Sequence, residues 1–390
     1  MSTESIALLK LAAAGGAVAP RRALLEMHGT ASAVLAARAS AWRAGGLSDQ
    51  QIQRLQRPDE TDLQRTLTWL ESPSHHLIGW KDADYPPMLR RISGAPLALF
   101  IEGDPNLLWR PAVAVVGSRS PTAGGRDNAY AFSRALATAG IVVVSGMAAG
   151  IDTAAHEAAL AAPNGATVAV LGTGPDVAYP PSNAGLRDRI AAQGALVSEH
   201  PPGTKAIQSH FPSRNRIIAG LALGTVVIEA AERSGALITA RLAGESGREV
   251  FAVPGSIHNP LARGCHRLIR EGAGLVESAQ EVIAALAPLA SELAFALRTR
   301  LDEAEPGPLP GSLQMPGDLE PDYQKLWDAL GFDPTGMDQL VSRTGLTAAE
   351  LSSMLLVMEL DGRVAVEHGR YQRKTGFFTS TASSTQAEGQ

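Results

Sequence analysis

The chain has 390 residues, of which 45% are hydrophobic and 19% are charged, and its formal net charge is −5. This composition is typical of a globular protein and excludes a largely disordered chain. The negative net charge excludes a protein that binds nucleic acid through overall basicity. A binding site for a polyanion must therefore be local, built from a few arginines and backbone N–H groups.

Membrane insertion and secretion are not expected. No uncharged apolar stretch reaches the roughly 18 residues that a membrane span needs, and no basic region precedes the first apolar residues. The single cysteine, Cys265, cannot form an internal disulfide, which fits a reducing compartment. We therefore expect a cytoplasmic protein without a membrane span.

The first domain in chain order is expected to be helical and to cover residues 1–75. Apolar residues recur there at helical spacing, and glycine-containing breaks at 14–16, 28–30 and 45–48 separate the short helices. The pattern is typical of SAM or helix-hairpin-helix domains. A DNA-binding unit and a packing or dimerisation module share this pattern, so both functions stay open.

Residues 80–295 are expected to form a Rossmann-like α/β domain. Short runs rich in β-branched residues alternate there with helical stretches, and each run is separated from the next by 20 to 30 residues, about the length of one crossover. Continuous apolar strands joined by helices predict a doubly wound, mostly parallel sheet with helices on both faces. The expected strands are 113–116, 141–145, 167–171, 195–198, 225–229 and 250–253.

The C-terminal part is expected to hold a linker, a winged helix and a tail. Residues 296–321 form the expected linker, because five prolines fall within its last 21 residues. Three helical stretches followed by a short hairpin over 322–374 are typical of a winged-helix domain. Residues 375–390 are polar and low in complexity, so we expect disorder. Because residues 291–390 carry 8 basic and 15 acidic side chains, we expect the winged helix to contact protein or to autoinhibit rather than to read DNA.

Doubly wound sheets bind ligands outside the carboxyl ends of their strands, so residues that follow a strand are the candidates for a site. Gly117, Ser118 and Arg119 follow the first expected strand. The glycine lets the backbone approach an anion, the next helix start offers free N–H groups, and the arginine adds charge. Ser145 and Gly146 follow the second strand in the same way.

The helix after the second strand contains two notable ionisable side chains. Asp152 is its expected N-cap residue. His156 lies one turn further along. We interpret His156 as a buried residue bonded to the neighbouring loop, with a catalytic role as the alternative.

The densest polar cluster reads HFPSRNR. Ser213 is the expected N-cap of a helix, which places Arg214 and Asn215 in its first turn. Cations at that end oppose the helix dipole, so they imply a compensating anion. A bound phosphate and an internal carboxylate are both candidates for that anion. The internal candidates are Glu199 and Glu229.

Two further features complete the expected site. Phe211 is expected in the core, with stacking on a nucleobase as the alternative. The helix start at Ser234–Thr239 offers hydroxyl and N–H donors after another strand. Several anion-binding helix starts along one edge favour a polyphosphate backbone over a single phosphate.

Motifs that would indicate an enzyme or a cofactor are absent from the sequence. It contains no G-x-G-x-x-G after the first strand, no P-loop and no G-x-S-x-G. Histidine and cysteine never occur at the spacing of zinc ligands. We therefore expect no cofactor, no metal and no catalytic activity.

Motifs distributed over the middle of the chain resemble one bacterial family. Val113–Arg119 reads VAVVGSR, Ser145–Asp152 reads SGMAAGID and Phe211–Arg216 reads FPSRNR. Shorter matching pieces are Tyr85-Pro86, Tyr179-Pro180, Ser234-Gly235 and Val253–Gly255. Together these residues resemble the DNA-processing protein A (DprA/Smf) family.

The resemblance implies a homodimeric, non-enzymatic protein that binds single-stranded DNA through the Rossmann-like domain. It further implies loading of the RecA recombinase during natural transformation. The implied DNA contacts are Arg119, Arg214, Asn215 and Arg216, beside the loop at Ser145 and Gly146. Further candidates are Gly117, Ser118, Ser234 and Thr239. The sequence departs from the family pattern at Ala149 and Ser213, where larger or basic residues are common, and Lys205 is a candidate replacement charge.

A nucleotide-processing enzyme of the phosphoribohydrolase type is the alternative function on a similar fold. Such an enzyme would use Glu229 or Glu232 as acid/base and Arg214 on a nucleotide phosphate. The sequence lacks the P-G-G-x-G-T signature of those enzymes. This absence favours the DNA-binding function.

Overall fold

The structure is a computed structural model, and the chain divides into two compact units, Met1–Glu305 and Pro306–Gln390. Each unit is described by itself. The described residues are 2–303, 321–330, 335–360, 364–367 and 370–373.

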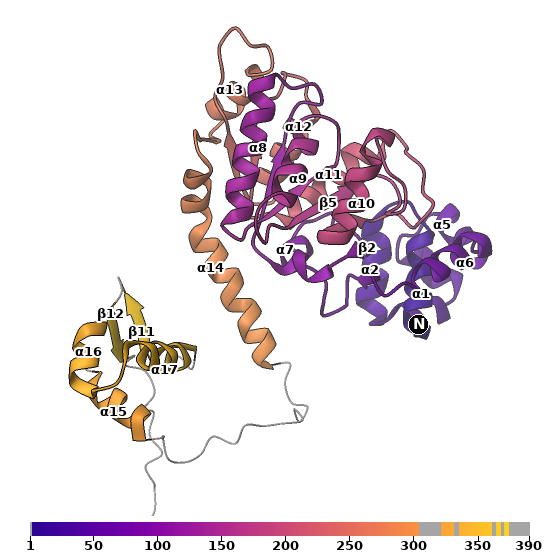
Figure 1. Ribbon diagram of the computed structural model, residues 1–390. Coiled ribbons are helices and arrows are strands. Elements are labelled where there is room, and N and C mark those ends of the chain that lie inside the picture. Colours follow the sequence, from indigo (N-terminus) through magenta and orange to yellow (C-terminus); the bar gives the residue numbers. More distant parts are fainter. Residues whose placement is uncertain (1, 304–320, 331–334, 361–363, 368–369, 374–390) are drawn as a thin grey trace, which may run out of the picture. The chain divides into compact units, whose positions relative to one another are not determined.

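A nine-stranded sheet forms the centre of the first unit (Figure 1), in the order β1-β2-β6-β5-β4-β3-β7-β8-β9. The strands from β6 to β9 in this order run parallel, and β2 lies antiparallel to both of its neighbours. From β3 the chain builds the sheet first in one direction and then in the other, which is the predicted doubly wound order. The strands are β1 His75–Gly79, β2 Ala98–Gly103, β3 Ala112–Val116, β4 Val142–Ser145, β5 Thr167–Leu171, β6 Ala195–Ser198, β7 Gly224–Val227, β8 Glu249–Ala252 and β9 Gly274–Leu275.

Helices cover both faces of the sheet. Residues of α7, α11 and α12 share one buried cluster with the strands, and residues of α8, α9 and α14 share another. Two short 3-10 helices, η1 Pro105–Trp109 and η2 Pro181–Asn183, lie in connections. The α-helices are α7 Pro87–Arg90, α8 Ala123–Thr138, α9 Ile151–Leu160, α10 Ala184–Gln193, α11 His210–Leu221, α12 Gly235–Glu245, α13 Arg263–Arg270 and α14 Ala279–Glu303.

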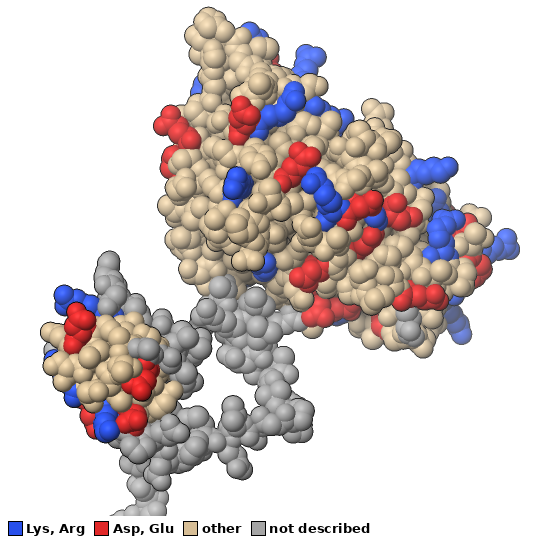
Figure 2. All heavy atoms as spheres, in the orientation of Figure 1, with Lys and Arg blue, Asp and Glu red and all other residues tan. Residues whose placement is uncertain are grey.

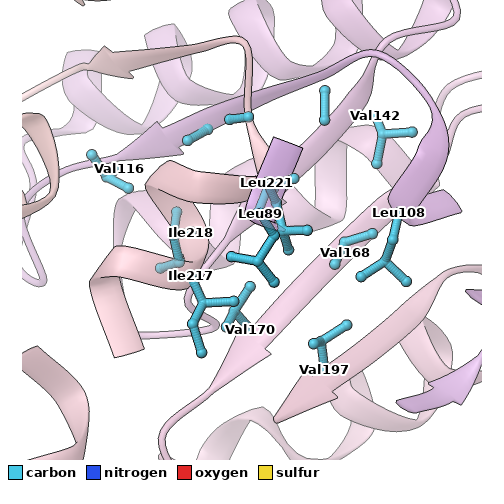
Figure 3. Close-up of a cluster of buried hydrophobic side chains, with 14 of the residues drawn as sticks. Leu89, Leu108, Val116, Val142, Val168, Val170, Val197, Ile217, Ile218 and Leu221 are labelled. Atoms are coloured by element: carbon cyan, nitrogen blue, oxygen red, sulfur yellow. The ribbon is translucent and has the colours of Figure 1, made fainter. Parts of the chain in front are cut away.

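The buried strands explain the uninterrupted apolar runs in the sequence. Successive strand residues point to opposite faces, so a strand covered on both faces needs apolar side chains at every position. Val116 and Val170 lie in the cluster that contains Ile217 and Leu221 of α11 (Figure 3). Val115 lies in the cluster on the other face. The predicted α/β class is confirmed.

The structure departs from the sequence expectation at β1, β2, β9 and α14. Strands β1, β2 and β9 were not among the expected strands. Strand β1 begins with two histidines and reads as a polar segment, β9 has only two residues, and the apolar run at the start of β2 was not recognised as a strand. Helix α14 continues to Glu303, so residues 296–303 are helical and the prediction that the linker begins at 296 is wrong. All five prolines of the expected linker lie beyond this helix. Residues 304–320 lie outside the described part of the chain.

The N-terminal helices pack against this sheet. Their buried residues share one cluster with Leu97 and Ala98 at the start of β2, and they belong to the same compact unit as the sheet. The division into domains 1–75 and 80–295 therefore remains a prediction. The helices are α1 Thr3–Ala13, α2 Val18–His28, α3 Ala31–Ala36, α4 Ala39–Ala44, α5 Asp49–Gln56 and α6 Glu60–Trp69.

At the connection between α2 and α3, an internal carboxylate already binds the start of α3. The Glu4 carboxylate accepts the backbone N–H groups of Ala31 and Ser32 at the start of α3. These are the groups that a DNA-binding hairpin would offer to a phosphate. The contact favours the packing function over the DNA-binding function for this module.

The second unit contains the elements of a winged helix. Leucines and methionines of its three helices form a small core with Val364, and its three strands pair in the order β10-β12-β11. Thr347 and Glu350 hydrogen-bond reciprocally at the start of α17, as a capping box does. The elements are α15 Pro321–Ala329, β10 Thr335–Gly336, α16 Met337–Thr344, α17 Ala348–Leu360, β11 Val364–Glu367 and β12 Arg370–Arg373. The expected tail, 375–390, lies outside the described residues.

Candidate nucleic-acid interface

A groove of about 850 Å³ opens at the carboxyl ends of β3 and β7. These two strands are neighbours at the point where the chain reverses the direction in which it adds strands, and doubly wound folds bind ligands there. The walls come from the turn 116–119, Ala148 and Asp152, Tyr179, the stretch 206–218 and the stretch 231–239.

The fold gathers most of the predicted contacts around this groove. Seven of the eleven line it, namely Gly117, Ser118, Arg119, Arg214, Asn215, Ser234 and Thr239. The other four, Ser145, Gly146, Lys205 and Arg216, do not. The strand-end rule therefore found the position of the groove, and the tertiary structure decides which side chains reach it.

Arg119 is the exposed cation of the groove. In the described part of the chain its side chain makes no hydrogen bond and no ion pair. The turn before it runs close to α9, because a Cβ on Gly117 would lie 2.7 Å from Ile151 Cγ1 and 3.0 Å from the Glu229 carbonyl oxygen. The guanidinium group of Arg119 is therefore held at the groove with all its donors available for a bidentate anion.

The N-terminus of α12 forms a second donor wall. The Ser234 hydroxyl accepts the Ala236 N–H at 3.2 Å and caps the helix. The Asn215 side-chain amide donates to the Gly235 carbonyl oxygen at 3.4 Å and connects α11 to α12. Thr239 is buried one turn further and also lines the groove. The positive end of the α12 dipole therefore faces the groove.

Arg214 lines the groove, but its guanidinium group is hydrogen-bonded inside the protein. Only 4% of the residue is exposed, and its Nη1 donates to the carbonyl oxygens of Gly146, at 2.8 Å, and Val170. The Asp152 carboxylate accepts the N–H groups of Gly146 and Ala148 at 3.1 and 3.3 Å. Burial lowers the pKa of Arg214 to about 10, against the opposing charge of Asp152, so Arg214 stays cationic at neutral pH. Together the two side chains hold the loop between β4 and α9.

Two predicted helix starts are wrong by a few residues. Helix α11 begins at His210, so Ser213 lies inside it and Arg214 lies in its second turn. Asp152 is likewise inside α9, whose N-cap is Gly150, and its carboxylate folds back onto the preceding loop. The N-cap of α11 is another serine, Ser209, so the capping preference fitted two positions.

Glu199 is an internal partner of the FPSRNR arginines, as predicted, but it pairs with Arg216 and not with Arg214. Glu199 accepts from the two terminal nitrogens of Arg216 at 2.7 and 2.6 Å, and Arg216 Nε donates to the Gly94 carbonyl oxygen at 2.7 Å. Burial alone would raise the pKa of Glu199, but the hydrogen bonds and charge of Arg216 lower it below its usual value. The carboxylate that acts on Arg214 is Asp152. The guanidinium group of Arg216 is thus bonded within the protein, which disfavours a direct DNA contact, and the role of Arg216 as a contact stays a prediction.

The loop residues after β4 are also internal. Ser145 is fully buried, and its hydroxyl donates to the Val115 carbonyl oxygen at 2.7 Å. Gly146 uses both its N–H and its carbonyl in the internal hydrogen bonds of the loop. These internal bonds disfavour direct DNA contacts from Ser145 and Gly146, whose role as contacts stays a prediction. Lys205 is exposed beside Ala206, which lines the groove, and its role as a contact stays a prediction.

His156 is a core residue. It is fully buried, and its Nδ1 lies 2.7 Å from Oγ1 of Thr167 on β5. Because that hydroxyl donates to the Val143 carbonyl oxygen, it accepts from His156. Burial lowers the pKa of His156 to about 3, so the ring is neutral. The expected burial is confirmed, although the partner is a strand rather than the neighbouring loop.

This buried histidine predicts a pH-dependent stability. Its pKa of about 3 lies below the ordinary value of 6.5, so as pH falls the unfolded chain takes up this proton first. The contribution of the neutral His156 ring to the free energy of unfolding is complete above about pH 6.5. Between about pH 6.5 and about pH 3 the free energy of unfolding falls by about 1.4 kcal/mol per pH unit. Between about pH 7 and about pH 5, the free energy of unfolding measured in urea should fall more for wild type than for His156→Asn. An identical wild-type-minus-variant difference at both pH values would contradict the assignment.

The carboxylates of the alternative enzyme are not assembled in the groove. Glu229 accepts the Thr122 N–H at 2.9 Å, the Thr122 hydroxyl at 2.7 Å and the Asn259 amide at 3.0 Å. It is buried and does not line the groove, and Glu232 lines a different pocket. Among the described groove residues, Asp152 is the single carboxylate, and it is bonded to its own loop. Within the described ranges, no three side chains group as metal ligands.

The structure adds Tyr179, Gln208 and Ile238 to the groove, which the sequence analysis did not single out as site residues. Tyr179 lies in the connection that follows β5, so the strand-end rule would have found it. Ile238 lies within the helix start Ser234–Thr239 that was expected after a strand, whereas Gln208 carries no such signal.

These observations define a class of protein. It is a Rossmann-like α/β protein with an open groove, lined by an exposed arginine, at the reversal point of a parallel sheet, together with a winged-helix unit. Across the described ranges, no helix combines the length and the apolar character needed to cross a membrane.

Comparisons with known proteins identify the family. Residues 76–287 match the family described as DNA recombination-mediator protein A, and residues 310–370 match the DprA winged helix domain. Protein Smf of Escherichia coli (strain K12) is 40% identical over 331 residues, which cover 84% of this chain and 85% of that protein. The chain belongs to the DNA recombination-mediator protein A family. This confirms the resemblance and the winged helix, and the family description names a mediator rather than a catalyst, in agreement with the expectation of a non-enzymatic protein.

Two solved structures are similar to this chain. DNA processing protein A from Streptococcus pneumoniae has a TM-score of 0.65 and 40% sequence identity, over 73% of this chain and 98% of that one. DNA processing protein A from Helicobacter pylori has a TM-score of 0.50 and 28% identity, over 55% of this chain and 96% of that one. The second structure is described as giving insights into a unique single-stranded DNA binding mode.

Proposed function

We propose that this chain binds single-stranded DNA in the groove between β3 and β7 and passes the strand to the RecA recombinase. One observation carries the DNA-binding part. The unpaired guanidinium group of Arg119 and the N-terminus of α12 converge on one concave groove. The single-stranded DNA binding mode described for the Helicobacter pylori protein supports the same conclusion.

The phosphate backbone is the part of the ligand that this groove suits. Arg119 can bind two oxygens of one phosphate, and the positive end of the α12 dipole attracts another. Figure 2 shows basic and acidic side chains interspersed over one face of the molecule rather than a continuous basic surface. Because the formal net charge of the chain is −5, attraction of a polyanion must be local.

The size of the groove favours one strand over two. A volume of about 850 Å³ lies in the range of pockets for small ligands, about 300–1,000 Å³. Such a space holds a few nucleotides of a flexible strand and not a duplex. Phosphate contacts carry no base information, so we propose binding without sequence preference.

Oligonucleotide titrations test this function. We expect a single strand to bind more tightly than the duplex of the same length, with log K falling against log salt by about 0.7 for each phosphate neutralised. Mixed-sequence and homopolymer strands should bind alike. Equal affinity for single and double strands, or affinity independent of salt between about 50 and 200 mM, would contradict the proposal.

No observation favours the alternative phosphoribohydrolase. Its acid/base candidate Glu229 is bonded to Thr122 and Asn259 and lies outside the groove. Incubation with nucleoside monophosphates is the direct assay, and we expect no release of free base. Release that depends on Glu229 would overturn the assignment of a non-enzymatic function.

RecA loading, natural transformation, homodimerisation and a cytoplasmic location complete the proposal and are supported by the family resemblance. The winged helix is proposed to contact protein. Its third helix, Ala348–Leu360, contains Glu350 and Glu359 and no lysine or arginine, so it lacks the charge with which recognition helices approach DNA. Light scattering of the free protein and co-elution with RecA and a single strand test these points.

A further inference from the structure

Two aromatic rings lie against each other on the wall of the groove. Tyr179 follows β5, Phe211 lies in the first turn of α11, and both line the groove. Their ring centroids are 4.8 Å apart with an interplanar angle of 37°. This arrangement is typical of a favourable aromatic pair.

The two rings differ in what they offer to a ligand. Phe211 is half-buried, and a Cβ on Gly172 would lie 3.0 Å from its Cδ1. The Phe211 ring is therefore packed between the backbone at Gly172 and the ring of Tyr179. Tyr179 is 41% exposed. Phe211 thus supports the pair, and Tyr179 is the ring that faces solvent in the groove.

We propose that Tyr179 stacks on an unpaired nucleobase of the bound strand. The inference rests on the proposed function and adds a base-binding position to it. The groove offers a phosphate the guanidinium group of Arg119 and the positive end of the α12 dipole, whereas Tyr179, which is 41% exposed, offers a base an aromatic ring. A single strand exposes both kinds of group, phosphates and flat bases, so it can engage both.

Stacking on Tyr179 selects single strands and tolerates any sequence. Every base has a π-face, so the contact does not distinguish bases. In a duplex both faces of a base are covered by its neighbours, and the ring has no partner. The contact involves no charge, so it contributes affinity without changing the salt dependence, in contrast to Arg119.

The experiment compares two ligands and three variants of the full chain. The ligands are an oligothymidine strand and a fully abasic strand of the same length, which share their phosphates and differ in bases. The variants are Tyr179→Ala, Tyr179→Phe and the control Tyr130→Ala. Tyr130 is 38% exposed on α8 and does not line the groove. Thermal melting of each variant verifies that it is folded.

We expect wild type to prefer the oligothymidine strand. Tyr179→Ala should weaken its binding by about 5- to 140-fold, which is about 1–3 kcal/mol for one stacked base, and should leave abasic binding and the salt slope unchanged. Tyr179→Phe and Tyr130→Ala should bind like wild type.

Two results would overturn the inference while the proposed function stands. They are equal binding of both strands by wild type, and a folded Tyr179→Ala protein that keeps the full preference for bases. Failure of wild type to bind either strand would instead reject the proposed function itself. The two failures are therefore distinguishable within one set of titrations.

Discussion

Replacement of Arg214 by alanine is expected to lower the free energy of unfolding by about 2–5 kcal/mol, because two buried carbonyl oxygens lose their donor at about 1–3 kcal/mol each. The substitution removes the hydrogen bonds to the carbonyl oxygens of Gly146 and Val170, and with them the positive charge that favours the ionised form of Asp152. Urea or thermal unfolding measures the loss. Arg214→Lys keeps the charge without the planar group, so we expect an intermediate stability.

The same variant decides whether Arg214 also contacts DNA. Arg214 lines the groove, but its Nη1 is bonded internally and its Nε is buried. We therefore expect a folded Arg214→Ala protein, measured well below its melting temperature, to keep the salt slope of wild type. A stable Arg214→Ala protein with a slope shallower by about 0.7 would make Arg214 a phosphate contact rather than a residue that positions the loop.

Replacement of Arg119 by alanine has the opposite profile. The side chain is exposed and unpaired among the described residues, so its loss should change stability by no more than about 0.5 kcal/mol. We expect it to weaken single-strand binding by about 1.5–3 kcal/mol, the range for hydrogen bonds to charged groups. The salt slope should become shallower by about 0.7 because one phosphate contact is lost. Fluorescence anisotropy over a salt series measures both quantities.

A matched control separates this contact from general charge. Arg134 is an exposed arginine of α8 that lies outside the groove. Arg134→Ala changes the net charge by the same amount, so it should bind single strands almost like wild type. Equal losses from Arg119→Ala and Arg134→Ala would mean that overall charge, and not the groove, binds the strand.

The arginines of the FPSRNR segment show how far the sequence could be interpreted. Arg214 stands three, four and seven residues before Ile217, Ile218 and Leu221, which face the sheet. That spacing marks one face of a helix, so the sequence already contained a signal that Arg214 is buried. The expected helix start at Ser213 concealed it, because capping preference was given more weight than periodicity.

Arg216 is a different case. No local pattern indicates that its partner is Glu199, which lies 17 positions earlier in the chain. Both side chains come together only after α11 has packed beside the end of β6. The edge strand β1 was missed for a related reason, since a short strand that begins with two histidines becomes recognisable only when β2 pairs with it.

The doubly wound sheet, the winged helix and the position of the groove could all be predicted from the amino-acid sequence alone. Periodicity and apolar runs are local properties, and the carboxyl ends of parallel strands meet at one edge whatever their side chains are. Which polar side chains face the groove, and which are hydrogen-bonded internally, became visible only in the folded structure. Arg119, Arg214 and Arg216 cannot be distinguished by residue type. Burial removes water from a guanidinium group, so Arg214 and Arg216 need hydrogen-bond partners within the protein. Arg119 is exposed to solvent, so a phosphate can replace water at its guanidinium group.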